Sequence, residues 1–577
     1  MSDIIYKFIE KGINISPEAY ERIINLKNPL TFTNNLLLKL KSTHTKKELS
    51  SPLTEETVLK YLNNEENTNN NTLNENNAPI EENSNVNVSS AVIGDNSKVN
   101  VSKIVENKSE VVESQNETIK PQIESIESQN EGNKKANTAH NPQSTVKNSQ
   151  NKKFVPTDVS KSFRNLYKSD TQYNFEVIQD TTNKSYTSGE LSNLISYFGS
   201  RFNKLSNILS KRPELRVHQK ISDIVGNVND LNLIGMVKEI RTTKNNHRIL
   251  ELEDDTGEIS VLFHKDNQEL FNESEMLVKD EVIGITGEKK GTLAIASQII
   301  HPGVQRIPKK EMDFSIAFTS DVHVGSLKFL EQAFLNFIDW INGDYGNEDL
   351  RKIGKDIKYL VIAGDIVDGI GIYPSQDKEL KIKDITEQYD KAAEYLGKLR
   401  SDVKIILGPG NHDASRIAEP QPAVPEDYAN SLYQLDNVEF VSNPAVVNIE
   451  GFNTLIYHGK SFDDLAMSIK GVSYQKNDLI MEEMLKMRHL APIYGEKTPL
   501  ASELEDHLVI DEVPDIFHTC HIHINKYKNY NGVHMINSGS FQTQTEFQKI
   551  HNLDPTPGIV SILHRGEYME LDFSKTN

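Results

Sequence analysis

The sequence predicts a chain of several domains that ends in an α/β domain, with a small closed β-barrel directly before it. From about residue 310 onward, apolar strand-like runs alternate with helical stretches, which is typical of an α/β domain. Between residues 213 and 308 the sequence carries five short strand signals separated by turns, enough for a small closed barrel. A length of 577 residues leaves room for both domains and for further segments before them.

The N-terminal part is expected to consist of a helical segment and a linker. Residues 1–60 have helical patterns, with Pro17 at an expected first helical position, and form either a small docking module or an appendage without a core of its own. Residues 61–152 are predicted to be a disordered linker, because runs such as "NNEENTNNNTLNENNAPIEENSN" hold too little apolar surface to offset the entropy of ordering them. Within the linker, "NVNVSSAVIGDNSKVNVSK" is either a short hairpin or inert linker.

Residues 153–310 are predicted to hold one amphipathic helix followed by the barrel. Over residues 189–211, apolar residues recur at helical spacing, at Leu191, Leu194, Ile195, Phe198, Phe202, Leu205 and Leu209. The strand signals that follow, with "KNN" and "DDTGE" as turns, favour a barrel of the oligonucleotide/oligosaccharide-binding type, an OB-fold. Such barrels bind single strands through aromatic side chains, but these strands have Phe263 and few other aromatic residues. A protein-docking role is therefore at least as well supported as direct binding to DNA.

The predicted α/β domain, residues 311–577, places polar residues in the turns after its apolar runs "FSIAFTS", "YLVIAG", "VKIILG" and "NTLIYHG" and in "FHTCHIHIN". Since the carboxyl ends of strands in an α/β sheet share one rim, these turns should meet there. The residues that the turns supply are Asp321, His323, Asp365, Asp368, Asn411, His412, Asp413, His458, His521 and His523. A lone D-x-H pair is common, but the ordered series D-x-H, G-D-x-x-D-G, G-N-H-D, H-G and H-x-H is highly specific.

These residue types suit a site with two divalent metal ions. Two such ions clamp the attacking and leaving oxygens of a phosphoryl displacement, and a shared carboxylate, for which Asp365 is placed, bridges them. Imidazole, carboxylate and amide ligands favour manganese, iron or zinc over calcium. His412, beside Asn411, is placed to protonate the leaving oxygen, and Asp413 either orients His412, the favoured interpretation, or caps a following helix. The ions would also supply positive charge that the chain itself lacks.

Composition limits the function classes. The net charge of −20, from 63 Lys and Arg against 83 Asp and Glu, argues against broad electrostatic binding to nucleic acid but leaves room for a local site. The single cysteine, Cys520, excludes a disulfide framework and the structural zinc sites that need two or more cysteines from one chain. No long apolar stretch indicates a signal peptide or a membrane span, so an intracellular, cytoplasmic protein without a membrane partner is expected.

The series of turns resembles that of the calcineurin-like metallophosphoesterases, over roughly residues 312–575. A narrower resemblance rests on "GPGNHDASRIAEPQPAVP", "YHGKSFDD", "KTPLASELEDHLVIDEVPDIFHTCHIH" and "NSGSFQTQTEFQKIHNLDPTPG", which are similar to the small subunits of archaeal family D DNA polymerases. With the barrel included, that resemblance covers about residues 155–577. It implies a metallophosphoesterase β-sandwich flanked by helices, after an OB-fold barrel that helps to hold the large polymerase subunit.

The resemblance also implies an activity and a site. The activity is that of a 3′–5′ exonuclease that proofreads for a separate large catalytic subunit of an archaeal replicative polymerase, acting on a DNA 3′ end; a sliding clamp is a partner only through the polymerase. Carried over by motif, one metal ion would be held by Asp321, His323, Asp365 and His523, and the other by Asp365, Asn411, His458 and His521, with His412 as the acid. Manganese is the first candidate for both ions, with iron, zinc or magnesium as alternatives.

One departure from the resemblance is visible. The last loop of the family usually has the pattern G-H-x-H, and here Cys520 takes the glycine position. If that position requires a positive φ, the cysteine adds strain; otherwise Cys520 is a small bystander, because the ligand set is complete without a thiolate.

Other residues near the motifs have weaker assignments. Arg416 and Lys460 either bind a DNA phosphate or form ion pairs within the protein. The remaining expectations are a structural role for His518, the ordering of its own loop for Asp368, and a helix start for Asp463 and Asp464.

Two further functions compete with the exonuclease. In the first, the chain is a catalytically inactive structural subunit, like the eukaryotic polymerase B-subunits that keep this fold and have lost ligands; the complete ligand set argues against it. In the second, the chain is a stand-alone repair nuclease or phosphatase of the same superfamily; the barrel, the linker and the "AEPQP" stretch argue against it.

Overall fold

The computed structural model describes residues 172–184, 187–550 and 552–575, together with Ile23, Thr33 and Leu36. Apart from these three residues, the helical module predicted at 1–60 lies outside the described residues, and so does the linker predicted at 61–152. The chain divides into two compact units between residues 149 and 150, and the structure below belongs to the second. Among the described helices, none combines the length and the apolar character needed to cross a membrane.

Five strands close into a barrel, as the sequence predicts. Their order around the barrel is β2 (Val228–Thr242), β3 (Arg248–Glu253), β4 (Glu258–Phe263), β6 (Leu293–Ile300) and β5 (Val282–Lys290), and the short helix α7 (Gln268–Ser274) follows β4. Alternate residues of β3 and β4 point inward, as the two-residue period of a strand requires. Phe263 is fully buried in this core, so it cannot serve as a stacking platform for a nucleic-acid base.

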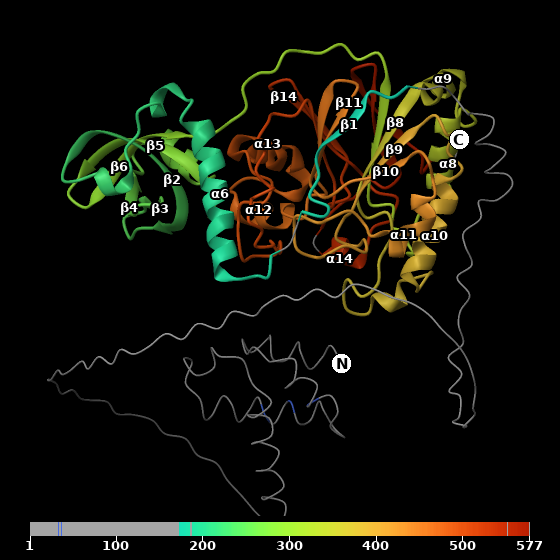
Figure 1. The fold of residues 1–577 in the computed structure, drawn as a ribbon, viewed down its shortest axis with the longest axis horizontal. Coiled ribbons are helices and arrows are strands. Elements are labelled where there is room, and N and C mark those ends of the chain that lie inside the picture. The colour runs from blue at the N-terminus through green and yellow to red at the C-terminus, as the bar shows by residue number, and fades with distance from the viewer. Residues whose placement is uncertain are drawn as a thin grey trace, which may run out of the picture. The chain divides into compact units, whose positions relative to one another are not determined.

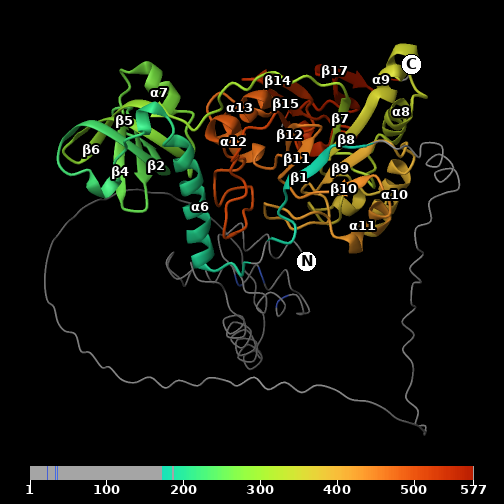
Figure 2. The same cartoon turned by 45° about the horizontal axis from the view of Figure 1, so that its top comes forward.

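The predicted helix is also confirmed and connects the barrel to the domain that follows, although Leu191 and Ile195 of its predicted apolar face are exposed. It is α6 (Leu191–Leu209), and its Leu205 and Leu209 pack against the barrel. On the same helix the fully buried Arg201 bonds to the second domain: Nε donates to Asp506 at 2.7 Å and a guanidinium NH donates to the carbonyl of Pro492 at 2.5 Å. Figures 1 and 2 show α6 between the barrel and the helices α12 (Phe462–Ser468) and α13 (Asn477–Met487).

The C-terminal domain is built on two six-stranded sheets. The first sheet has the order β1 (Phe175–Gln179), β11 (Ala445–Ile449), β12 (Phe452–Ile456), β13 (Ile516–Thr519), β15 (Val533–Asn537) and β14 (Lys526–Tyr530). The second sheet has the order β10 (Val438–Phe440), β9 (Lys404–Gly408), β8 (Ile357–Ala363), β7 (Ser315–Thr319), β16 (Ile559–His564) and β17 (Glu567–Asp572). Strands β7 to β10 run parallel in the second sheet, and β12, β13 and β15 run parallel in the first.

Three buried clusters show that the sheets pack face to face and that helices cover both outer faces. The cluster between the sheets joins residues such as Phe318 and Val361 to Val447 and Ile536. On the outer face of the second sheet lie α8 (Glu331–Asn342), α10 (Ile385–Leu396) and α11 (Glu426–Tyr433), with α9 (Glu348–Asp356) beside α8. Helices α12 and α13 cover the first sheet. The result is a helix–sheet–sheet–helix arrangement around one internal core (Figure 1).

The predicted boundary of the barrel domain is wrong at its start. Residues 175–179 fall in the segment assigned to the helix and barrel, but they form β1, which adds to the edge of the first sheet beside β11 (Figure 1). The pairing is antiparallel, with Phe175 opposite Ile449 and Val177 opposite Val447. Phe175 and Val177 pack against the core between the sheets, and this burial stabilises the strand far from its neighbours in sequence.

Candidate active site

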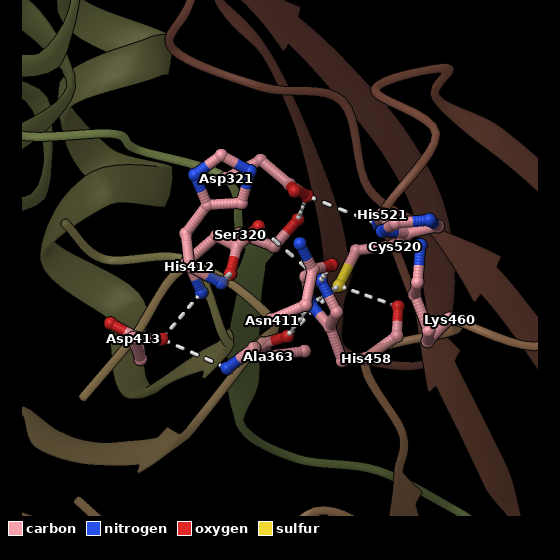
Figure 3. A network of polar contacts seen from close by, with 12 residues as sticks. Ser320, Asp321, Ala363, Asn411, His412, Asp413, His458, Lys460, Cys520 and His521 are labelled. Carbon is pink, nitrogen blue, oxygen red and sulfur yellow. Dashed lines mark hydrogen bonds and ion pairs between the residues drawn. The ribbon is translucent and has the colours of Figure 1, made fainter. Parts of the chain in front are cut away.

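The side chains of the candidate site come from loops at the carboxyl ends of parallel strands, as the sequence predicts. In the second sheet, Asp321 and His323 follow β7, Asp365 follows β8, and Asn411 and His412 follow β9. In the first sheet, His458 follows β12, and His521 and His523 follow β13. The structure brings all seven predicted ligands and His412 together at the rim that the two sheets share. Figure 3 labels five of these eight residues, which are Asp321, Asn411, His412, His458 and His521.

Asp321, His323 and His523 form one group of possible metal ligands. Nε2 of His323 lies 3.2 Å from Nε2 of His523, and Oδ1 of Asp321 lies 3.3 Å from Nε2 of His523. All three side chains are buried, and Oδ1 of Asp321 accepts no hydrogen bond from any residue that the structure describes. Each residue offers one ligand atom within 4.8 Å of the other two. One cation fits among them.

Asp365, Asn411 and His458 form a second group. Nε2 of His458 lies 3.0 Å from Oδ1 of Asn411 and 3.4 Å from Oδ2 of Asp365. Nδ1 of His458 lies 2.9 Å from the carbonyl oxygen of Ala363, so a proton on Nδ1 leaves the Nε2 lone pair directed at the group. The ring of His521 lies 5.2 Å from that of His458, centroid to centroid, which brings the fourth predicted ligand to the same side.

Asp365 lies between the two groups. Its Oδ2 is 4.0 Å from Nε2 of His323 and 3.4 Å from Nε2 of His458. Its other oxygen, Oδ1, accepts a hydrogen bond from the backbone N–H of His412 at 2.7 Å, which holds the carboxylate in place. One oxygen within reach of both groups is the geometry expected of a bridging carboxylate.

Five of the seven predicted ligands have left-handed backbone conformations. The positive φ angles are 47° at Asp321, 55° at His323, 52° at Asp365, 75° at His521 and 60° at His523. Each costs on the order of 1–3 kcal/mol for a residue other than glycine and persists only where the surroundings enforce it. Backbone bonds do so here, since Asp321 N donates to Gly364 O and His323 N to Asp365 O, each at 3.0 Å. Backbone strain gathered at one rim is typical of a functional site.

The charges of the cluster stabilise one another. Burial alone would raise the pKa of Asp321, but His523, followed by His458, outweighs it and holds that pKa below its usual range. Burial alone would lower the pKa of His323, but the Asp368 carboxylate outweighs it and raises the value to about 9. The histidines beside these buried carboxylates therefore favour the charged form of the carboxylates against the effect of burial.

His412 lies at the edge of the cluster, and its partner is not the predicted one. Nδ1 of His412 lies 2.7 Å from the carbonyl oxygen of Asp368. The carboxylate of Asp413 instead accepts hydrogen bonds from the backbone N–H of Asp365 at 2.7 Å and of Gly410 at 2.8 Å, and from the hydroxyl of Tyr389 at 3.1 Å. The prediction that Asp413 orients His412 is therefore wrong: Asp413 ties two ligand loops together, and the backbone of Asp368 orients the imidazole.

Two carboxylates play larger parts than the sequence suggests. Asp368 is fully buried and places Oδ1 3.1 Å from Nδ1 of His323, so besides its loop it fixes a predicted ligand. Asp463 and Asp464 lie in the first turn of α12, in agreement with the predicted helix start, but Oδ2 of Asp463 also lies 3.4 Å from Nε2 of His521. Asp463 lies outside the ligand motifs, so its contact with His521 could not be predicted from them, whereas Asp368 lies within G-D-x-x-D-G but was expected only to order its own loop.

A cavity of about 500 Å³, here called the site cavity, opens onto the cluster. Its lining includes His323, Asp365, Asn411, His412, Lys460 and His523. Lys460 donates to Asp463 at 2.7 Å and still borders the cavity, so a contact with DNA phosphate stays a prediction. Arg416 differs: it donates to the carbonyls of Ala418 and Pro420, pairs with Glu503 at 2.7 Å, and is not among the described residues that line the cavity. These contacts give Arg416 a structural role in its own loop, and binding of a DNA phosphate by Arg416 stays a prediction.

Cys520 and His518 have structural roles in the described part of the chain. Cys520 is buried without a positive φ, so the glycine position of the motif imposes no strain here. Its Sγ donates to the carbonyl of Ala363 at 2.9 Å and lies 3.1 Å from Nδ1 of His458, on the side away from Nε2. Burial raises the pKa of the thiol to about 12, so it stays protonated. His518 contacts Ser538 at 2.5 Å, and burial lowers its pKa to about 3.

Comparison with known proteins gives consistent matches. A family model for the B subunit of DNA polymerases alpha and epsilon matches residues 316–527, and one described as "OB-fold nucleic acid binding domain" matches residues 231–305, which confirms the OB-fold prediction for the barrel. A protein of Methanothermobacter thermautotrophicus named "DNA polymerase II small subunit" is 61% identical over 419 residues, 73% of this chain and 87% of that protein. Proteins of the same name from Archaeoglobus fulgidus and Methanocaldococcus jannaschii are 45% identical over 401 residues (69% of this chain, 80% of that protein) and 42% over 405 residues (68% of each).

Proposed function

The chain belongs to the family of DNA polymerase II small subunits, the small subunits of archaeal family D DNA polymerase, and we propose that within such a polymerase it is a metal-dependent 3′–5′ exonuclease. It would hydrolyse the terminal phosphodiester bond of a DNA 3′ end and so proofread for a large catalytic subunit. The observation that carries the proposal is the complete set of seven ligand side chains at one rim, with His412 beside them. A structural subunit without activity would have no reason to keep that set together.

The donor set fits a binuclear centre of the metallophosphoesterase type. Asp321, His323, His523 and one oxygen of Asp365 would hold one ion, and Asp365, Asn411, His458 and His521 the other. Nε2 of His323 and Nε2 of His523 face each other at 3.2 Å. Beside them, the buried Oδ1 of Asp321 has no hydrogen-bond donor among the described residues, so the three atoms suit a cation. Bound ions would supply positive charge to the phosphoryl oxygens and lower the pKa of the attacking water. Imidazole, carboxylate and amide ligands favour manganese, with iron, zinc or magnesium as alternatives.

His412 is the residue proposed to supply a proton. As water attacks the phosphorus, the bond to the 3′ oxygen of the preceding nucleotide breaks, and that oxygen needs a proton to leave as a hydroxyl. With Nδ1 held by the Asp368 carbonyl, the ring offers Nε2 to the site cavity. Burial lowers the pKa of His412, so its imidazolium is a stronger acid than an exposed one.

Lys460 is proposed to hold a neighbouring phosphate. It borders the site cavity on the side of His458 and His521, and Figure 3 shows it across the cluster from His412. Its pairing with Asp463 keeps the ammonium group at that position. In a chain with a net charge of −20, such a local cation gives the DNA backbone a defined place to approach.

The other proposed partner is the large catalytic subunit of the polymerase, because the relatives are named as small subunits. The one phenylalanine in the barrel strands, Phe263, is buried in the core, so it cannot stack on a DNA base. This favours docking of the large subunit over direct DNA binding as the role of the barrel. Contact with a sliding clamp would come only through the polymerase. A cytoplasmic location remains a prediction from the sequence.

A nuclease assay tests the proposal. The full chain, alone and with its large subunit, is given Mn²⁺ and a DNA primer with a mismatched, labelled 3′ end. Wild type should release the terminal nucleotide, Asp365→Ala should release almost none, and His412→Ala should be about 10²- to 10⁴-fold slower, the usual contribution of a general acid. His264→Ala, at an exposed histidine of the barrel, is the matched control and should behave as wild type. If wild type releases nothing in any metal tested, the proposal fails.

A further inference from the structure

The loop of residues 369–374, "GIGIYP", exposes three large apolar side chains, and one of them, Tyr373, lines the site cavity. Ile370 is 46% exposed, Ile372 is 39% exposed and Tyr373 is 36% exposed. Single exposed apolar residues are ordinary, but three within four residues at the edge of a polar, buried cluster are not explained by packing. Apolar surface in this position is expected to contact a ligand.

Hydrogen bonds hold this loop firmly. Gly369 donates its N–H to Oε1 of Gln388 at 2.9 Å, and Ile372 donates its N–H to Oε1 of Gln376 at 3.0 Å. Gly369 also lies against the backbone of His412: a Cβ at Gly369 would come within 2.2 Å of the His412 carbonyl oxygen, and its φ is +71°. The exposed side chains are therefore presented by an ordered backbone, which is what a preformed binding surface requires.

Tyr373 connects the loop to the proposed chemistry. It lines the same cavity as His412 and Asn411, and its ring centroid lies 6.3 Å from that of His412. Directly before the loop stands Asp368, whose carbonyl oxygen orients His412. In a nucleotide whose phosphate lies at the proposed ligands, the sugar separates the base from the phosphate. The ring of Tyr373, beside His412, would give that base an apolar neighbour.

We propose that Tyr373, flanked by Ile372, is a stacking subsite for the base of the 3′-terminal nucleotide. Every base has an aromatic face, so the subsite would accept all four bases without reading sequence. A base inside a duplex has both faces covered by its neighbours and must leave the stack before Tyr373 can contact it. The subsite would therefore favour a frayed or mismatched end over a paired one, because unstacking is least costly there. This inference rests on the proposed nuclease function.

A binding comparison tests the subsite separately from catalysis. Two short single-stranded DNA probes, labelled at the 5′ end, differ only at the 3′ terminus, where one has a base and the other an abasic sugar. A phosphorothioate in the last linkage slows hydrolysis, and dissociation constants are measured by fluorescence anisotropy with Mn²⁺ present. Wild type should bind the probe with the base roughly 5- to 150-fold more tightly, the range for stacking one base on an aromatic side chain.

Three variants decide the outcome. Tyr373→Ala should lose the preference for the base, and Tyr373→Phe should keep it, because the ring rather than the hydroxyl does the stacking. Tyr428→Ala, at a tyrosine of α11 that is also exposed, should keep it as well. Equal binding of both probes by wild type, or an unchanged preference in Tyr373→Ala, would overturn the subsite. If wild type binds the probe with the base more tightly but releases no nucleotide from unmodified DNA, the subsite is retained and the nuclease function is refuted. If wild type releases nucleotides but binds both probes equally, the nuclease function is retained and the subsite is refuted.

Discussion

Replacing Asp368 by alanine should weaken metal binding at His323 without removing any ligand. Asp368 is fully buried, and its Oδ1 lies 3.1 Å from Nδ1 of His323, the ring nitrogen on the other side from the cluster. The carboxylate thus fixes the ring so that Nε2 faces His523 and Asp321. It also raises the pKa of His323 to about 9, against the burial that would lower it, and a more basic imidazole is a better ligand.

The expected loss follows from these contacts. Removing the partner that orients a metal-ligating histidine typically costs about 10- to 100-fold in metal affinity, or roughly 1.4–2.8 kcal/mol. Stability should change less, because the two glutamines that donate to Asp368 each keep another acceptor: Gln542 donates to Ser326 Oγ at 3.0 Å, and Gln376 donates to the Asp368 carbonyl at 2.8 Å. The main effect should therefore appear in metal binding rather than in folding.

The assay is nucleotide release from the mismatched primer as a function of Mn²⁺ concentration. Asp368→Ala should need about 10- to 100-fold more Mn²⁺ for half of its maximal rate and should approach the wild-type rate at saturation. Asp368→Asn should shift less, since its amide oxygen can still accept from Nδ1 of His323. His323→Ala should not recover at any Mn²⁺ concentration. A wild-type Mn²⁺ dependence in Asp368→Ala would refute the positioning argument.

Three further predictions concern buried residues outside the proposed ligand set. Arg201→Leu leaves Asp506 buried without its guanidinium partner and should lower the free energy of unfolding by about 3–5 kcal/mol in urea denaturation, whereas an unchanged midpoint would show that α6 does not hold the two domains together. Burial raises the pKa of Glu419 from 4.5 to about 7, so the folded chain binds that proton more readily and loses stability as pH rises from about 4.5 through 7. Glu419→Gln should therefore stabilise the chelator-treated protein by up to ~3 kcal/mol at about pH 8 and hardly at about pH 4, and an equal effect at both pH values would contradict this. Cys520→Gly should keep the Mn²⁺ dependence of nucleotide release, because Sγ lies beside Nδ1 of His458 and away from Nε2. The same variant should lose about 1–2 kcal/mol of folding stability. A loss of Mn²⁺ affinity would instead indicate that the thiolate is a metal ligand.

The gathering of the proposed ligand residues at one rim could be predicted because the motifs that supply them are local in sequence. A polar motif directly after an apolar strand is visible in the sequence, and the geometry of α/β sheets brings such strand ends to one rim. Asp321 with His323, and His521 with His523, each lie in a single turn whose place follows from its strand. The five-strand barrel was predictable for the same reason, since its turns separate each strand from the next.

Contacts that depend on side-chain direction could not be predicted. Asp413 follows His412 in sequence, but its carboxylate accepts hydrogen bonds from the backbone of Asp365 and Gly410. The position of a residue next to another in a loop does not determine which groups its side chain bonds to. The place of β1 depends on β11, about 270 residues later, and a five-residue strand does not specify its partner. The nearness of Tyr373 to His412 appears only once the loop between them is folded.

The number of Mn²⁺ ions bound per chain tests the central claim most directly. If the seven side chains form a binuclear centre, wild type should hold two ions, measured by elemental analysis after equilibrium dialysis. His323→Ala and His458→Ala, each on a different side of Asp365, should each hold about one. His412→Ala should keep both ions while it loses activity. Wild-type chains that hold no Mn²⁺, or histidine variants that hold as much as wild type, would contradict the account.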